Sequence, residues 1–309
     1  MATPARERVV GSVLGLALGD ALGAPFEFRR ARSIPDPVPA FELPWGALPP
    51  GSTTDDTAMA RNLVRSLAAR GGFDADDLVA RHLAWFAGDP PDVGNLTRRV
   101  LARVAAGEDA PTAARRDWEE RGPEVSAGNG SVMYCAPLGL AYAARPRAEL
   151  RAAAAALSAL THHDPRCRMA VAAVASVAAD LACGAAATDA VAAALADAEP
   201  LPGGEVLAFL VGAIGASRAI DGPDQGFCLY AAGVGLQSVL RDGDVEGGLR
   251  RVVGLGGDAD TNAAVAGALL GARDGRAGLP EAWLARLVER EAIEAEAEAL
   301  ARSAGAGAV

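Results

Sequence analysis

The stretch GLGGDADTNAAVAGALLGA, residues 254–272, places two carboxylates where a glycine-marked segment gives way to an alanine-rich run. Apolar residues recur through that run at helical spacing, so it predicts a helix over residues 260–272. Asp258 and Asp260 stand at its start, where carboxylates satisfy exposed N–H groups and complement the helix dipole. STTDDTAMA, residues 52–60, repeats this arrangement at the start of another helical run. The chain therefore carries the same unusual pattern near both of its ends.

Helical spacing extends over almost the whole sequence, and the alternation typical of strands does not. Hydrophobic residues make up 51% and aromatic residues 5% of the chain, with alanine dominant, which is typical of close-packed helices. We expect an all-α fold, a compact orthogonal bundle forming a single domain over residues 1–303, followed by a frayed tail over 304–309. The predicted helices span 7–22, 56–70, 75–87, 95–106, 111–121, 130–144, 148–160, 166–183, 188–198, 205–219, 225–241, 244–253, 260–272 and 280–302.

One segment interrupts the helical pattern. Residues 29–53 are rich in proline and glycine and show no helical spacing. Long loops inside compact domains are usually functional. We expect an ordered loop that leads into the first acidic cluster.

The charge and cysteine content exclude several classes of function. A formal net charge of −10 leaves no overall field to attract nucleic acid or an anionic membrane, and neither is expected as a partner. The four cysteines are scattered through apolar contexts without a CxxC spacing, which favours reduced thiols and a cytoplasmic protein. Asp20 interrupts the apolar amino-terminal stretch and argues against a signal peptide, and no segment is expected to span a membrane. All 29 basic residues are arginine, which indicates a GC-rich, bacterial source.

Each acidic cluster alone is explained by helix capping, but two clusters of nearly the same composition favour a shared site. If they meet, their carboxylates raise one another's pKa and cannot all ionise without cations between them. Neither cluster contains His or Cys, which disfavours zinc and favours Mg²⁺ or Mn²⁺. We therefore expect a dinuclear metal site in a cleft of the bundle.

Three other features are weaker candidates. Gly128-Asn129-Gly130-Ser131 opens a predicted helix, where N–H groups bind anions, although the motif alone is typical of a turn. For His162 and His163, either one caps the helix that ends near Leu160 and the other faces solvent, or one of them donates to a substrate phosphate or ribose hydroxyl. Glu27 lies between two phenylalanines and is either a solvated loop residue or a carboxylate lining the cleft.

Taken in order, six motifs resemble the ADP-ribosylglycohydrolase family, the group typified by dinitrogenase reductase-activating glycohydrolase. The resemblance spans residues 9–273 and implies an all-α hydrolase with two Mg²⁺ or Mn²⁺ ions. Its substrate would be an ADP-ribosylated protein or small molecule, and ADP-ribose would be its product. The motifs are GLALGDALGAPFEF (15–28), TTDDTAMA (53–60), DVGNLTRRVL (92–101), GNGSVMYCAPLGLAY (128–142), THHDP (161–165) and GGDADTNAAVAGALLGA (256–272).

The resemblance also implies a role for each matching residue. The metal ligands would be Thr54, Asp55, Asp56, Asp258, Asp260 and Thr261. The residues that contact substrate would be Asp55, Gly94, Gly128, Asn129, Gly130, Ser131 and His162. The catalytic residues would be Glu27, Asp56, Asp258 and Asp260. Tyr134 stands where many members have arginine, and the residues after His162 differ from those of arginine-specific members, so the acceptor stays open.

The implied reaction needs an activated water and a leaving group that departs without a strong acid. Two divalent ions can orient the distal ribose and lower the pKa of a water between them. Asp258 or Asp260 would accept the proton of that water, and Glu27 would position the departing atom.

Two other functions compete with this one. A metal phosphohydrolase of the HD type could use His82, His163-Asp164 and Asp180, but it leaves both acidic clusters unexplained. A protein of the same fold that only binds ADP-ribose is the second alternative. Both acidic clusters are complete, which favours the enzyme.

Overall fold

The computed structural model describes residues 3–306 and confirms the all-α fold. Two short strands, β1 (Arg29–Arg30) and β2 (Gly256–Gly257), form the sheet found within these residues. The helices are α1 (Arg6–Gly23), α2 (Asp55–Arg70), α3 (Ala75–Ala87), α4 (Asn95–Ala105), α5 (Ala110–Arg121), α6 (Ala136–Tyr142), α7 (Arg147–Ala159), α8 (Pro165–Ala182), α9 (Ala187–Ala198), α10 (Gly204–Ala213), α11 (Cys228–Arg241), α12 (Val245–Gly254), α13 (Ala259–Asp274), α14 (Glu281–Leu284) and α15 (Arg290–Ala306).

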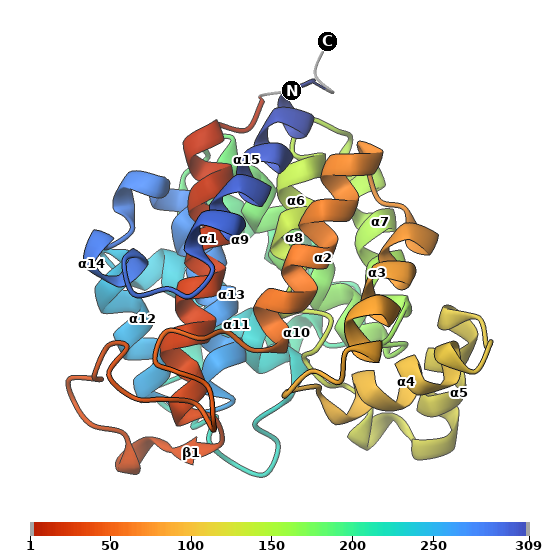
Figure 1. Ribbon diagram of the computed structural model, residues 1–309, viewed down its shortest axis with the longest axis horizontal. Coiled ribbons are helices and arrows are strands. Elements are labelled where there is room, and N and C mark those ends of the chain that lie inside the picture. Colours follow the sequence, from red (N-terminus) through yellow and green to blue (C-terminus); the bar gives the residue numbers. More distant parts are fainter. Residues whose placement is uncertain (1–2, 307–309) are drawn as a thin grey trace.

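Helices α1 and α13, from opposite ends of the sequence, lie side by side at the centre of the bundle (Figure 1). Their contact is made by glycines spaced four residues apart on α1, so that one face of the helix carries no side chains. A Cβ added to Gly15 would lie 2.2 Å from the Gly267 carbonyl oxygen, and one added to Gly19 would lie 2.0 Å from that of Ala263. Backbone packs directly on backbone here, which sets the spacing between the two helices.

The other helices surround this central pair. Helices α8, α11 and α12 pack on α13, and α15 packs on both α1 and α2. Helices α4 and α5 pack on each other and form a peripheral pair, drawn in yellow at one side of the bundle (Figure 1). Nearly all residues of α1 and α13 are buried, because other helices cover the remaining faces of the pair.

The loop predicted over residues 29–53 is ordered and begins with a strand pairing. Strand β1 pairs antiparallel with β2, so that Arg29 lies opposite Gly257 and Arg30 opposite Gly256. Both glycines have positive φ values, 68° and 74°, which side chains rarely tolerate. A Cβ added to Gly256 would lie 2.6 Å from the Arg29 carbonyl oxygen. The pairing ties the segment that follows Glu27 to the residues that precede Asp258.

Several predicted helix boundaries were wrong. The helix predicted over 130–144 begins at Ala136, because residues 128–135 form turns and a bridge to Phe227. The helix predicted over 280–302 is two helices, α14 and α15, separated by a turn in which Glu289 has a φ of 58°. Helix α15 continues through Ala306, into the predicted frayed tail, and residues 307–309 lie outside the described residues.

The amino-terminal helical segment also differs from expectation. Arg6–Phe26 is long and apolar enough to cross a membrane by length and composition, with a mean hydropathy of 1.6. In the structure, 94% of its apolar window is buried inside the protein. This burial is what a core helix shows, and it agrees with the position of α1 against α13.

Candidate metal centre and substrate cleft

The two acidic motifs meet, as predicted. Helix α2 begins at Asp55 and α13 begins at Ala259, and the first turns of the two helices face each other. The Thr261 hydroxyl lies 3.3 Å from Asp56 Oδ2, which links residues 205 positions apart. Carboxylate oxygens of Asp56, Asp260 and Asp20 all lie within 4.8 Å of one another. The close packing of α1 on α13 is what brings these groups together.

A cleft of about 260 Å³ opens beside this cluster. It contains most of the predicted site residues and some that the sequence reading did not assign, notably Asp92 and Phe28. The lining residues are Glu27, Phe28, Asp55, Asp56, Asp92, Gly94, Asn95, Leu96, Thr97, Gly128, Asn129, Gly130, Met133, His162, Gly226, Asp258, Asp260 and Thr261.

The carboxylates of the cleft lack cationic partners among its lining residues, which include no arginine. Burial is the largest cause that raises the pKa of Asp55, Asp56 and Asp260 well above the usual range, and neighbouring carboxylates raise each of them further. Asp56 Oδ1 is buried and has no hydrogen-bond partner within residues 3–306. Such a group needs a proton or a cation, and oxygen-only ligands suit Mg²⁺ or Mn²⁺.

Asp92 also lines the cleft, although it was not among the predicted site residues. With Glu27 and Asp260 it forms a second carboxylate group whose oxygens lie within 4.8 Å of one another. Burial raises its pKa, and the charge of Asp258 raises it further. Asp92 opens the motif DVGNLTRRVL, immediately before a helix, so a third acidic residue at a helix start was the available signal.

Glu27 lies in the cleft rather than in solvent. Burial, followed by the charges of Asp92 and Asp258, raises its pKa to about 8. The next residue, Phe28, donates its N–H to the Gly257 carbonyl oxygen at 2.7 Å, and this bond places Glu27 opposite the second acidic motif. Phe28 has a φ of 58° and its side chain is 58% exposed at the cleft rim.

The segment of Gly128, Asn129 and Gly130 forms another wall of the cleft. Asn129 donates its amide to Asp258 Oδ2 at 2.9 Å, and its N–H donates to the Gly226 carbonyl oxygen at 3.0 Å. A Cβ added to Gly130 would lie 3.0 Å from His162 Nε2, so glycine leaves room for that ring. The segment belongs to a turn and not, as predicted, to the start of a helix.

His162 faces this segment and is 2% exposed, so it is not the histidine that faces solvent. Its Nδ1 lies 2.8 Å from the Thr161 hydroxyl. Burial lowers its pKa to about 4, and the ring is therefore neutral near pH 7. A neutral imidazole with one nitrogen held by Thr161 can offer the other to a ligand.

Two predicted residues lie behind the cleft surface. Ser131 is fully buried and its hydroxyl lies 3.0 Å from that of Ser158, so its side chain does not reach the cleft. The Thr54 hydroxyl lies 2.9 Å from Asp20 Oδ1 and 3.3 Å from Asp56 Oδ2. Thr54 therefore adjoins the carboxylate cluster but does not line the cleft.

The residues of the HD-type alternative do not converge. His82 is buried against Asn62, whereas Asp164 caps α8 and accepts from Trp118. Asp180 pairs with Arg147 at 2.5 Å. The groups that could hold a metal within residues 3–306 include none of these side chains.

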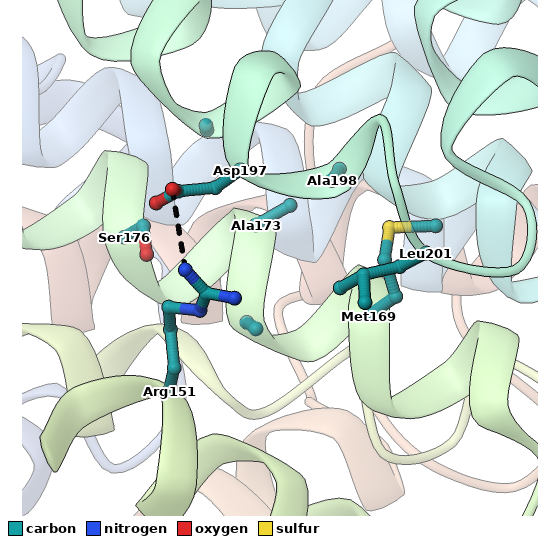
Figure 2. A pocket seen from close by; sticks show the side chains of 9 residues that line it. Arg151, Met169, Ala173, Ser176, Asp197, Ala198 and Leu201 are labelled. Atoms are coloured by element: carbon teal, nitrogen blue, oxygen red, sulfur yellow. Dashed lines mark hydrogen bonds and ion pairs between the residues drawn. The ribbon is translucent and has the colours of Figure 1, made fainter. Parts of the chain in front are cut away.

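Another cavity, between α7, α8 and α9, has a different character (Figure 2). Its walls are alanines with Met169 and Leu201, and its polar groups include the ion pair of Arg151 and Asp197 at 3.2 Å. At about 10 Å³ it has room for about one water molecule. The acidic cleft is therefore the candidate site for chemistry.

Comparison with known proteins identifies the family to which the chain belongs. The family model for ADP-ribosylglycohydrolase matches residues 1–308. The chain is 31% identical to the ADP-ribosyl-(dinitrogen reductase) glycohydrolase of Rhodospirillum rubrum, over 97% of each chain. It is 25% identical to the ADP-ribosylarginine hydrolase Tri1 of Serratia proteamaculans, over 95% of this chain and 79% of that one. A solved structure described as an ADP-ribosylglycohydrolase-related protein complex is 37% identical and superposes with a TM-score of 0.79 over 97% of this chain and 98% of that one.

Proposed function

Because the chain belongs to the ADP-ribosylglycohydrolase family, whose members are glycosidic-bond hydrolases, we propose that it is a metal-dependent ADP-ribosyl-acceptor hydrolase. It would cleave the bond between the distal ribose of ADP-ribose and an acceptor on a protein or small molecule, and release ADP-ribose. We also propose that it works in the cytoplasm, where buried thiols such as Cys135, Cys167 and Cys228 stay reduced.

The observation that carries the proposal is the set of buried carboxylates, from both ends of the chain, that face one cleft without cationic partners. The donor set is oxygen-only, and it includes Asp56 Oδ1, which has no hydrogen-bond partner within the described residues. Two Mg²⁺ or Mn²⁺ ions fit this set. Their ligands would be Thr54, Asp55, Asp56, Asp258, Asp260 and Thr261. When bound, the ions would supply charge neutralisation and would lower the pKa of a water molecule at the site.

The residues around the metal site would accept a proton from water and position the departing atom. Asp258 accepts the Asn129 amide through Oδ2, which orients the carboxylate and leaves its other oxygen to take a proton from the attacking water. Asp260, on the first turn of α13, is the alternative proton acceptor. Glu27 would position the departing oxygen or nitrogen, because its carboxyl lines the cleft close to Asp92 and Asp258.

The glycine-rich wall would hold the rest of the substrate. Gly128 and Gly130 line the cleft and would suit the diphosphate and distal ribose, since glycine allows close approach of the backbone. The neutral ring of His162 would hydrogen-bond a ribose hydroxyl or phosphate oxygen. Gly94, whose N–H donates to Asp55 Oδ2 at 3.0 Å, holds one predicted metal ligand in place.

The test is release of ADP-ribose from a panel of substrates ADP-ribosylated on arginine, serine and other acceptors. The protein is assayed with Mg²⁺, with Mn²⁺ and with a chelator. We expect turnover with metal and none with the chelator, and Asp56→Ala and Asp258→Ala should each abolish it. Asp197→Ala, which removes a carboxylate that is 39% exposed and paired with Arg151, is the matched control and should retain activity.

The outcome also separates the competing readings. Near-normal turnover by both Asp56→Ala and Asp258→Ala would refute the metal assignment. Calorimetry with ADP-ribose, with and without Mg²⁺, shows whether the cleft binds the product. Binding without turnover of any substrate in the panel would make the chain an ADP-ribose-binding protein instead.

A further inference from the structure

Asp20 belongs to the carboxylate cluster with Asp56 and Asp260, but the proposed mechanism gives it no role. It lies on α1 and its exposed fraction is zero. One of its oxygens lies within 4.8 Å of ligand atoms of both Asp56 and Asp260. In the sequence it only interrupts an apolar run, and a charge in the middle of a core helix needs a structural reason.

Asp20 caps helix α2 from another helix. Thr54 is the residue before α2, and its own side chain makes no capping bond in the described structure. Asp20 accepts the Thr54 N–H at 3.0 and 3.1 Å and the Thr57 N–H at 3.0 Å. These are N–H groups that a helix start leaves without internal partners. The first turn of α2 is therefore attached to α1 across 34 to 37 positions of sequence.

Asp20 also accepts two hydroxyl protons. The Thr54 hydroxyl lies 2.9 Å from Asp20 Oδ1, and the Thr57 hydroxyl lies 2.5 Å from Asp20 Oδ2. With two N–H groups and two hydroxyls, the acceptor sites of this carboxylate are filled, since a carboxylate has about four. Asp20 is therefore a poor direct ligand for a cation. A hydroxyl that gives its one proton to Asp20 keeps its lone pairs free, which is the orientation that Thr54 needs to bind a metal.

The position of Asp20 relative to α13 is set by backbone contact on either side of it. A Cβ added to Gly19 would lie 2.0 Å from the Ala263 carbonyl oxygen, and a Cβ added to Gly23 would lie 2.4 Å from Asp260 Cα. Asp20 thus stands between two points at which α1 and α13 are in direct backbone contact. A group that is held against α13 and bonded to α2 controls the separation of the two metal-binding motifs.

We infer that Asp20 is a positioning residue of the metal centre, which holds the first turn of α2 at a defined distance from Asp260 and orients the Thr54 hydroxyl. The inference rests on the proposed function, because it assigns Asp20 to a metal site that the proposal contains. Residues that support metal ligands typically change metal affinity by about 10–100-fold when they are mutated. The same size of effect is expected here.

The test compares Asp20→Asn, Thr57→Val and Ser12→Ala with the wild-type protein. Asp20→Asn keeps the shape of the side chain but replaces one acceptor oxygen by an NH₂ donor. Thr57→Val removes one of the two hydroxyls that donate to Asp20. Ser12→Ala is the matched control, since Ser12 is buried on the same helix and its hydroxyl has no partner within residues 3–306. Free Mn²⁺ is measured by electron paramagnetic resonance during titration, and circular dichroism reports the fold.

We expect Asp20→Asn to bind Mn²⁺ about 10–100-fold more weakly than wild type, Thr57→Val to show a smaller loss in the same direction, and Ser12→Ala to match wild type. Turnover of Asp20→Asn should recover at saturating Mn²⁺, which a misfolded protein would not show. If Asp20→Asn does not fold, the Thr57→Val titration decides.

Mn²⁺ affinities of Asp20→Asn and Thr57→Val within about twofold of wild type would overturn the inference and leave the proposed function intact. Failure of the wild-type protein to bind Mn²⁺ would remove both the proposed metal site and the role of Asp20.

Discussion

The substitution Gly19→Ala puts a methyl group where α1 and α13 touch through their backbones. The added Cβ would lie 2.0 Å from the Ala263 carbonyl oxygen and 2.8 Å from the Ala264 nitrogen. Ordinary contact begins near 3.4 Å, so the helices must separate locally by about 1.4 Å. The obstructing atoms belong to a buried helix and cannot rotate away as a side chain can.

The cost in free energy of unfolding follows from two opposing effects. Overpacking a core costs roughly 1–3 kcal/mol, and rigid backbone places this site at the upper end. Alanine gains about 1 kcal/mol over glycine in helix propensity. We therefore expect Gly19→Ala to lose about 2 kcal/mol of stability. Because α13 carries Asp260, Mn²⁺ should also bind more weakly.

The assay is urea unfolding followed by circular dichroism, with Gly212→Ala as the control. Gly212 lies in α10, and an added Cβ there meets no atom within 4 Å. The control should be unchanged or more stable, by about 0.4–1 kcal/mol. A Gly19→Ala protein as stable as Gly212→Ala would refute the close packing of α1 on α13 as the feature that spaces the site.

Two further predictions concern the cleft. Burial raises the pKa of Asp20 to about 6 and, with the charge of Asp92, that of Glu27 to about 8, so the metal-free folded protein keeps protons that the unfolded chain has released. In the presence of a chelator, its urea midpoint should therefore decrease as the pH is raised from 5 to 8. Saturating Mn²⁺ should make that decrease smaller. A midpoint that rises with pH would contradict the burial of these acids. Gly130→Ala places a Cβ 2.9 Å from His162 Cε1, which forces this buried ring to shift and should raise KM for the ADP-ribosyl substrate about tenfold. An unchanged KM would show that Gly130 does not contribute to substrate binding.

Local sequence patterns accounted for most of the helices, because helical spacing of apolar residues depends on neighbours three and four positions away. They failed where longer-range contacts override that spacing. The segment of Gly128 and Asn129 is held as a turn by its bridge to Phe227. The helix predicted over 280–302 is broken next to Val288, whose N–H donates to the Gly51 carbonyl oxygen at 2.9 Å. Neither contact leaves a mark in the local pattern.

The candidate site shows the same division. Asp56 and Asp260 stand out in the sequence because their surroundings repeat, and the structure brings them together as predicted. Asp92 and Asp20 stand alone in their segments, so the only signal for Asp92 is its position before a helix, and Asp20 only interrupts an apolar run. Ser131 matched a motif, but its hydroxyl faces Ser158 and not the cleft.

The helical character of the chain and the two acidic motifs at helix starts follow from the order of the residues, since both are properties of neighbours in the sequence. The distance between the motifs, and the other carboxylates that join them, follow from the packing of the helices. The reason is that this spacing depends on the backbone contact of α1 with α13, and on the bonds that Asp20 makes to Thr54 and Thr57. Contacts between segments more than 30 positions apart are set by packing, which no local pattern encodes.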